Sequence, residues 1–307
     1  MLDVTPDDVD TLAQKAGIAQ AEGDLPRAAA LLAPLHPPAD DTGALEIQVY
    51  QAILERRPAP IIPRLEEILA KPDPALGYNN GELRFWLGWA QEVAGDHAAA
   101  QESWRQARSE LEPFLKEQPD NYILIGDLAL TNMGLGDKAA ALALAERAMT
   151  VVPLEKDVVD GPAPIEILAR VAARLGEPDR AIAALQKLLS IPSEGALASR
   201  VPLTPALLRL DPMFDPLRND PRFQELILER IPKSLYNKGM KWYHRLKLCH
   251  NKRISRPRTA GEGSHFGPSE GEVRHRILID VKGPAPTAVV ADPAAQGWLE
   301  NRRQRKN

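Results

Sequence analysis

Two stretches of the chain can be written one above the other in register, and this repeat constrains the fold more than any other feature. Residues 81–107 and residues 122–148 each consist of an apolar helical pattern, a Gly-Asp turn and an alanine-rich helical pattern. A single unit of this kind cannot bury its apolar stripe alone, so it must stack on a neighbour. The repeat therefore predicts a row of stacked helical hairpins. The two turns are Gly95-Asp96 and Gly136-Asp137.

Weaker copies of the same unit lie at residues 8–37, 42–72 and 162–192. The turns fall at positions 23, 56, 95, 136 and 176, with spacings of 33, 39, 41 and 40 residues. This period is longer than the ~34 residues typical of two-helix repeats. In the second copy Arg56 stands in place of the turn glycine, so an ordinary helical hairpin outside the repeat is the alternative there.

The units resemble tetratricopeptide repeats. In the strong pair, the small and large residues of that family's pattern are found at Leu87, Gly88, Gly95, Ala100, Trp104, Ala107, Leu128, Ala129, Gly136, Ala141, Ala145, Ala148 and Pro153. The resemblance implies an all-α protein, a right-handed α-solenoid of about five such hairpins over residues 8–192. It says little about function, because this architecture carries many unrelated functions.

Residues 193–232 follow a different pattern, in which threonine or aspartate precedes proline at positions 204, 211, 215 and 220. Such a pair combines a capping side chain with a proline at the first helical position. We expect several short helices that form a C-terminal helical cap over the last hairpin, with its apolar face covered by Leu207, Leu210, Phe214, Leu217, Phe223 and Leu226.

The stretch from Leu210 to Phe223 also resembles the end of bacterial tetratricopeptide arrays. Those arrays are often fused behind a serine/threonine kinase domain, a winged-helix domain or an adenylate-cyclase-type domain. None of the sequence motifs of a protein kinase occurs in this chain. If the resemblance holds, the chain is a sensor or scaffold part without its effector domain.

Residues 233–307 form a basic tail with none of the preceding patterns. The tail has 16 Lys and Arg against 6 Asp and Glu, a net charge of +10, and since the whole chain carries −4, residues 1–232 carry −14. We expect mostly disorder here, with a single strand-like stretch at residues 273–281. A shifted reading frame is the alternative explanation of the abrupt change.

The remaining sequence signals concern the compartment. The chain has one cysteine, Cys249, so it has no internal disulfide framework and a reducing environment is expected. Its first eight residues are acidic and lack the apolar core of a signal peptide. No window approaches 18 uninterrupted apolar residues, so no membrane span is expected. These signals predict a cytoplasmic protein without membrane association.

In a tetratricopeptide array the first helix of each hairpin lines a concave groove. By register, the residues expected to face that groove are Glu46, Tyr50, Phe85, Trp89, Glu92, Ile123, Leu130, Met133, Arg170 and Arg174. An aromatic and methionine lining favours a helix or an extended peptide with apolar anchors. The alternative for Phe85 and Trp89 is that they belong to the core between hairpins. The Lys/Asn set with which chaperone-binding members grip a C-terminal carboxylate is absent from these positions.

No metal, cofactor or catalytic residue is predicted. His244, Cys249, His250 and His265 in the tail lack the paired spacing of a zinc site. The basic run 252–258, near Trp242 and Tyr243, has the composition of a nucleic-acid contact, but a solvated charge run is favoured. Among the acidic residues on the helices, no pair is set in an identifiable cleft, so the sequence names no candidate residues for acid–base catalysis.

The first hypothesis is a non-enzymatic scaffold that binds a protein or peptide in the concave groove. The second is the regulatory portion of a bacterial serine/threonine kinase-type signalling protein, and the third is nucleic-acid binding through the tail. The sequence leaves the partner and the oligomeric state undetermined.

Overall fold

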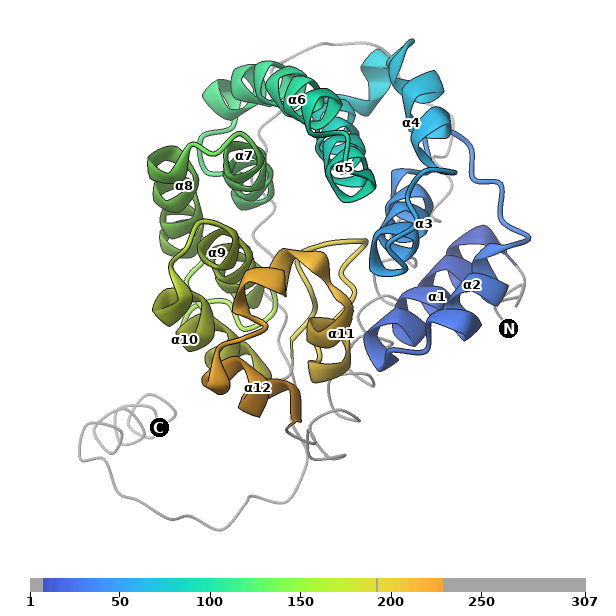
Figure 1. Ribbon diagram of the computed structural model, residues 1–307. Helices are drawn as coiled ribbons and strands as arrows, with labels where there is room; N and C mark the ends of the chain where they lie inside the picture. Colours follow the sequence, from blue (N-terminus) through green and yellow to red (C-terminus); the bar gives the residue numbers. More distant parts are fainter. Residues whose placement is uncertain (1–7, 192, 229–307) are drawn as a thin grey trace, which may run out of the picture. The chain divides into compact units, whose positions relative to one another are not determined.

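The computed structural model describes residues 8–191 and 193–228. All of them belong to one compact unit, residues 1–256, and a second unit, residues 257–307, lies outside the described residues. The described regular structure is entirely helical (Figure 1), which confirms the predicted all-α class. The tail prediction, with its cysteine, its histidines and its strand-like stretch, falls outside the described residues.

The helices follow the predicted units closely. Five pairs come first, and three short helices follow them. The bounds are α1 Val9–Glu22, α2 Leu25–Leu32, α3 Thr42–Leu54, α4 Ile62–Leu69, η1 Pro74–Leu76, α5 Asn79–Ala94, α6 His97–Glu117, α7 Tyr122–Gly134, α8 Lys138–Val151, α9 Pro162–Arg174, α10 Pro178–Leu189, α11 Pro205–Leu210, η2 Pro212–Leu217 and α12 Pro221–Leu228.

The same local structure occurs at three Gly-Asp turns. The glycine takes a left-handed conformation, which only glycine adopts without strain, and the aspartate that follows caps the next helix through its side chain. In the third pair, for example, Gly95 has φ 89° and the Asp96 carboxylate accepts a hydrogen bond from the Ala99 backbone N–H at 3.0 Å. The other two turns are Gly23-Asp24 and Gly136-Asp137.

The second pair departs from this pattern. Arg56 takes the left-handed conformation, with φ 58°, at a position where glycine would be unstrained. Its guanidinium donates two hydrogen bonds to the Asp215 carboxylate, at 2.7 and 2.8 Å. A seven-residue connection, 55–61, then separates α3 from α4, and α4 lies mainly against α5. The long connection explains why the second pair is more open than the others.

Helix α6 is longer than the sequence pattern indicated, because it continues through Pro113 to Glu117. A proline inside a helix removes one backbone hydrogen bond. The added turn places Phe114 and Leu115 against Leu124 and Leu128 of α7, so burial of apolar surface offsets that cost.

The C-terminal segment reaches further than the predicted cap. Helix η2 packs on α9 and α12 contacts α10, as a cap over the last hairpin should, but α11 also packs against α1 (Figure 1). The Thr204 hydroxyl donates a hydrogen bond to the Ala21 carbonyl of α1. The expectation that this segment covers only the last hairpin is therefore corrected: it joins the last pair of helices to the first.

Trp104 of α6 fills the space between the two strongest pairs. Its indole lies against Gly88 of α5 and Gly134 of α7, where an added Cβ would come within 2.5 Å and 2.4 Å of the ring. Its Nε1 donates a hydrogen bond to the Phe85 carbonyl at 3.2 Å. The glycines thus permit the close approach of three helices around one large side chain.

We predict that Gly88→Ala and Gly134→Ala each destabilise the fold by about 1–3 kcal/mol, because the new methyl group overpacks against the indole. Gly126→Ala on α7 is the matched control. Its Cβ would lie 3.4 Å from the nearest side-chain atom, an ordinary contact. The gain in helix propensity should then leave stability unchanged or raised by up to ~1 kcal/mol. Urea unfolding of the three variants measures the difference, and equal losses would refute the packing argument.

Candidate functional site

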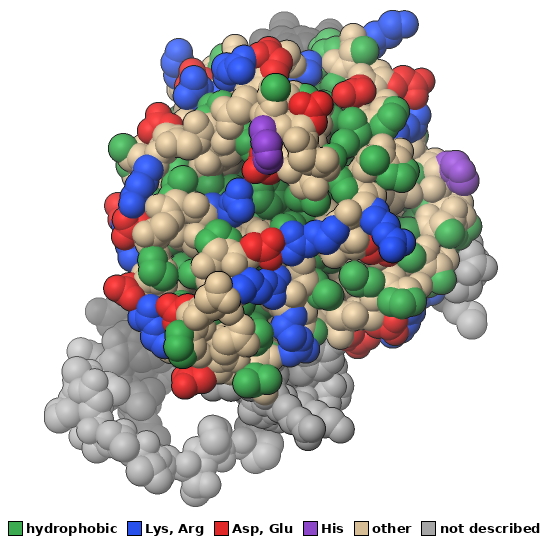
Figure 2. All heavy atoms as spheres, viewed as in Figure 1, with side chains coloured by type: hydrophobic (Ala, Val, Ile, Leu, Met, Phe, Trp, Pro, Cys, Tyr) green, Lys and Arg blue, Asp and Glu red, His purple; other side chains and the backbone are tan. Residues whose placement is uncertain are grey.

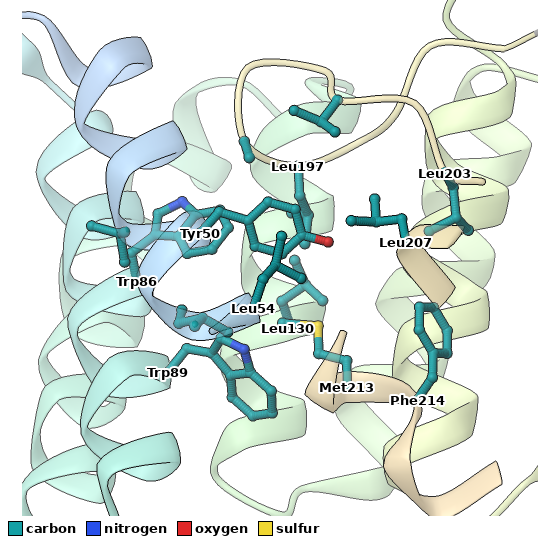
Figure 3. Packing of buried hydrophobic residues seen from close by; sticks show 14 of the residues in the cluster. Tyr50, Leu54, Trp86, Trp89, Leu130, Leu197, Leu203, Leu207, Met213 and Phe214 are labelled. Carbon is teal, nitrogen blue, oxygen red and sulfur yellow. The ribbon is translucent and has the colours of Figure 1, made fainter. Parts of the chain in front are cut away.

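The first helices of the pairs face the segment 193–217, which we call the inner segment. The inner surface denotes the side chains of α3, α5, α7 and α9 that lie toward it. Figure 3 shows the two sides of this packing, with Tyr50, Trp86, Trp89 and Leu130 on the inner surface and Leu197, Leu203, Leu207, Met213 and Phe214 on the inner segment. The surface on which a peptide groove was predicted is occupied by the protein's own chain.

The ten predicted groove residues divide by exposure. Buried are Glu46, Tyr50, Phe85, Trp89, Leu130, Met133 and Arg170. Glu92 and Arg174 are half-buried, and Ile123 is 39% exposed at the start of α7. No external partner can therefore contact the buried seven while the inner segment stays in place. Phe85 and Trp89 lie in the core, the position given by the alternative interpretation.

The Asp211 carboxylate is the main polar contact between the inner segment and the inner surface. It is fully buried, and its Oδ2 accepts a hydrogen bond from the Tyr50 hydroxyl at 2.6 Å and an ion-pair hydrogen bond from Arg170 Nη1. Its Oδ1 accepts from the Met213 backbone N–H at 2.9 Å, which caps η2. One side chain thus starts a short helix and binds two distant helices, α3 and α9.

Arg170 is held from several directions. Glu166, one turn earlier on α9, accepts from Arg170 Nε at 2.8 Å, and the Phe214 ring lies with its centroid 5.1 Å from the guanidinium carbon. Burial alone would lower the pKa of Arg170. The neighbouring Asp211, Tyr50 and Glu166 raise it by more, so the pKa lies well above its usual value and the guanidinium stays charged. Burial and the Asp211 charge raise the pKa of the Tyr50 phenol, so Tyr50 remains a hydrogen-bond donor.

A second group joins three predicted residues from two helices. The Arg174 guanidinium lies 5.1 Å from the ring centroid of Trp89 and 3.6 Å from the Glu92 carboxylate. Glu92 also pairs with His97 at 2.6 Å, which raises the pKa of that imidazole. On the face shown in Figure 2, a recess with hydrophobic side chains at its floor lies near the middle, with Lys and Arg side chains beside it. Because Glu92 and Arg174 are only half-buried, these two predicted groove residues remain accessible to solvent.

Three carboxyl groups from three helices make a third feature. Glu46 of α3 and Glu82 of α5 share a hydrogen bond, and Asp127 of α7 is close enough to interact with both. Burial, with the other carboxyls, raises the pKa of Glu46 and Asp127 well above their usual range. Burial raises the pKa of Glu82 to about 7. At neutral pH this group therefore retains bound protons.

The inner segment also contacts the acids through its backbone. The Ser199 N–H donates to Glu46 at 3.1 Å, and the Ala196 N–H donates to Glu166 at 2.9 Å. The residues that sequence reasoning missed are Glu82, Asp127, Glu166, Asp211 and Met213, whereas Phe214 was expected on the last hairpin and lies there against Arg170 of α9. An Asp-Pro pair signals a helix cap, so nothing in the local sequence of Asp211 announces its contacts with α3 and α9.

Within the described residues, no group of three or more His, Cys, Asp or Glu side chains is arranged to hold a metal ion. None of the helices in this part of the chain is long and apolar enough to cross a membrane. Comparison of the chain with family models, with curated proteins and with solved structures finds no match. The inner surface must therefore be interpreted from its own chemistry.

We predict that Arg170→Met destabilises the fold by about 3–5 kcal/mol, because it leaves Asp211 and Glu166 as buried charges without a cation. Arg180→Met is the matched control, since Arg180 pairs with Glu146 on the surface, where an ion pair contributes ~0–1 kcal/mol. Urea unfolding at neutral pH measures both. A loss for Arg170→Met no larger than that of the control would show that Asp211 does not depend on this guanidinium.

Stability should also depend on pH through the three carboxyl groups. The usual pKa of glutamate is 4.5, and in the fold that of Glu82 is about 7, so the folded state binds a proton that the unfolded state releases between these values. Stability should therefore fall as pH rises from 5 to 8, by on the order of 1–3 kcal/mol. Thermal unfolding across this range measures the slope.

Glu82→Gln should reduce that slope, because the glutamine cannot ionise. The control is Glu225→Gln on the exposed side of α12, which should leave the slope unchanged. A slope that stays the same in Glu82→Gln would contradict the assignment.

Proposed function

We propose that this protein is a non-enzymatic interaction scaffold that binds a protein or peptide on its inner surface. The five helical pairs serve as tetratricopeptide-like repeats of an α-solenoid, with the inner segment as a self-bound occupant. The single observation that supports this function is the nature of that occupant. Between residues 193 and 204 the chain is not helical, yet the inner helices bind it through side chains and backbone groups.

The inner surface has more polar groups than a helix-to-helix core requires. Carboxyl oxygens of Glu46 and Glu166 accept hydrogen bonds from backbone N–H groups, and the Tyr50 hydroxyl and the Arg170 guanidinium bind a side-chain carboxylate. Apolar side chains from α3, α5 and α7 surround them. Backbone and side-chain hydrogen bonds beside apolar contacts are how proteins recognise peptides in an irregular conformation.

A reversible staple tests this function in the full chain. Cβ atoms at Gly43 and Ser199 would lie 3.9 Å apart, within the range that a disulfide needs. We therefore propose the variant Gly43→Cys with Ser199→Cys, in which Cys249→Ser removes the native thiol. Oxidation ties the inner segment to α3, and reduction releases it within the same preparation.

The full-length variant would be immobilised and exposed to lysate of its own cells in both redox states. We expect a protein partner that binds to the reduced form and is lost, or weakened at least about tenfold, on oxidation. The chain without the two new cysteines controls for effects of the redox buffer. Equal capture by both forms would place binding outside the inner surface, and no specific partner in either form would argue against a scaffold.

A further inference from the structure

The inner segment shows which chemistry the inner surface binds. Besides the backbone contacts of Ala196 and Ser199, the inner segment binds the inner surface through four consecutive residues, Asp211, Pro212, Met213 and Phe214, all of them buried. The aspartate provides the charge for Arg170 and Tyr50, Met213 places its sulfur 3.4 Å from Arg170 Nη1, and Phe214 covers the guanidinium. A carboxylate and an aromatic ring thus bind one cation from two sides.

The receptor side of this contact belongs to the pairs and does not depend on the inner segment for its position. Arg170 is fixed by Glu166 on its own helix, with N–O distances of 2.8 Å from Nε and 2.7 Å from Nη2. Tyr50 packs edge-on against Trp86, with ring centroids 5.8 Å apart. Both donors therefore keep their orientation when the bound carboxylate is exchanged.

The four residues also form an element that is largely organised by itself. The Asp211 side chain caps η2 through the Met213 N–H, and Pro212 fixes the backbone at the first position of the turn. Only Oδ2 is used for the inner surface. A free peptide with the same residues can form this turn at low entropic cost, because its conformation is restricted before binding.

The connection to the last pair carries strain that favours exchange. Ala198, Ser199 and Arg200 take left-handed conformations, with φ of 49°, 54° and 70°. A non-glycine residue in that region costs roughly 1–2 kcal/mol. Release of the inner segment relieves this cost. A peptide bound from solution is not linked to the last pair, so its binding does not force residues 198–200 into the left-handed conformation.

The charge of the molecule sets a further requirement. Residues 1–232 carry a net charge of −14, so a run of acidic residues would be repelled at long range. The aspartate of the motif lies between Arg209 and Arg218, which donate to backbone carbonyl groups. The acid that directly follows the motif, Asp215, is paired with Arg56 and Arg218, so the flanks add no net negative charge to the carboxylate that Arg170 binds.

We propose that the inner surface binds, in exchange for its own residues 211–214, a partner peptide of the form Asp-Pro-apolar-aromatic whose flanks carry no net negative charge. This inference rests on the proposed function, since it defines the partner's chemistry. The aspartate binds Arg170 and Tyr50, the aromatic ring covers the guanidinium, and the proline preforms the turn.

The test uses a fluorescent peptide with the sequence of residues 203–218 and two full-length proteins. In the wild-type protein the tethered segment competes at an effective concentration of the order of millimolar, so the peptide should not bind. Asp211→Asn weakens the binding of the tethered segment and leaves the residues of the inner surface unchanged. This variant should therefore bind the peptide. Fluorescence anisotropy measures both, and circular dichroism verifies that the variant is folded.

Two altered peptides define the motif. A peptide with asparagine at the aspartate position should bind the Asp211→Asn protein about 10- to 100-fold more weakly, since a hydrogen-bonded charge is lost. A peptide with alanine at the phenylalanine position should also bind more weakly, by at least about tenfold. Addition of Arg170→Met to the protein should remove the preference for aspartate over asparagine.

If Asp211→Asn fails to fold, Phe214→Leu replaces it. This change removes the ring that lies over the Arg170 guanidinium, so it weakens the tethered motif while every buried charge keeps its partner. A folded variant that binds none of the peptides, or binds all three equally, would overturn the proposed motif. Redox-dependent capture by the stapled protein would then leave the scaffold function standing, so the two failures are distinguishable.

Discussion

The buried pair of Arg170 and Asp211 sets the position of η2 against α9. A charge removed from water is tolerated only with a partner of opposite charge and satisfied hydrogen bonds. Asp211 can meet this demand at one place, where Arg170 and Tyr50 both donate to it. Because these donors lie 41 and 161 residues away in the sequence, the pair joins α9 and α3 through the inner segment.

Exposed contacts at the edge of the segment have a different role. The ion pair of Arg56 with Asp215 is about 40% exposed, so screening by water leaves it little free energy. Its value is geometric, because it holds Arg56 in the left-handed conformation that closes α3. The one turn that lacks glycine is thus supported by the segment that crosses it, which makes the second pair dependent on the C-terminal residues.

The sequence predicted the helices because each begins and ends on a local signal. Gly-Asp turns and proline at the first helical position act within three or four residues, so they can be recognised without any tertiary information. The repeat pattern contained Gly88 and Trp104, but the packing of Trp104 against Gly134 joins two pairs and carries no local signal. The continuation of α6 through Pro113 is not local either, because the burial of Phe114 that offsets the cost of the proline depends on α7, a separate helix.

The inner surface could be predicted only in part. Helical register placed Tyr50 and Arg170 on one side of their helices, and the structure brings both to the inner segment at Asp211. Register cannot say what covers that side. The contact of Asp211 with Tyr50 spans 161 residues, and the shared protons of Glu46 and Glu82 depend on burial that no single helix creates.

The same polar residues have two consequences that must be weighed together. As parts of a core they add little, since a fold with apolar side chains of equal volume in their place would often be as stable as one with a buried ion pair. As a recognition surface, they give direction, because a buried guanidinium and hydroxyl accept a carboxylate in one orientation and reject chains without one. Arg170 has one carboxylate, Glu166, one turn away on its own helix and a second, Asp211, from the inner segment. A core that only had to be filled would not need both carboxylates around one cation, so this arrangement supports the proposed recognition.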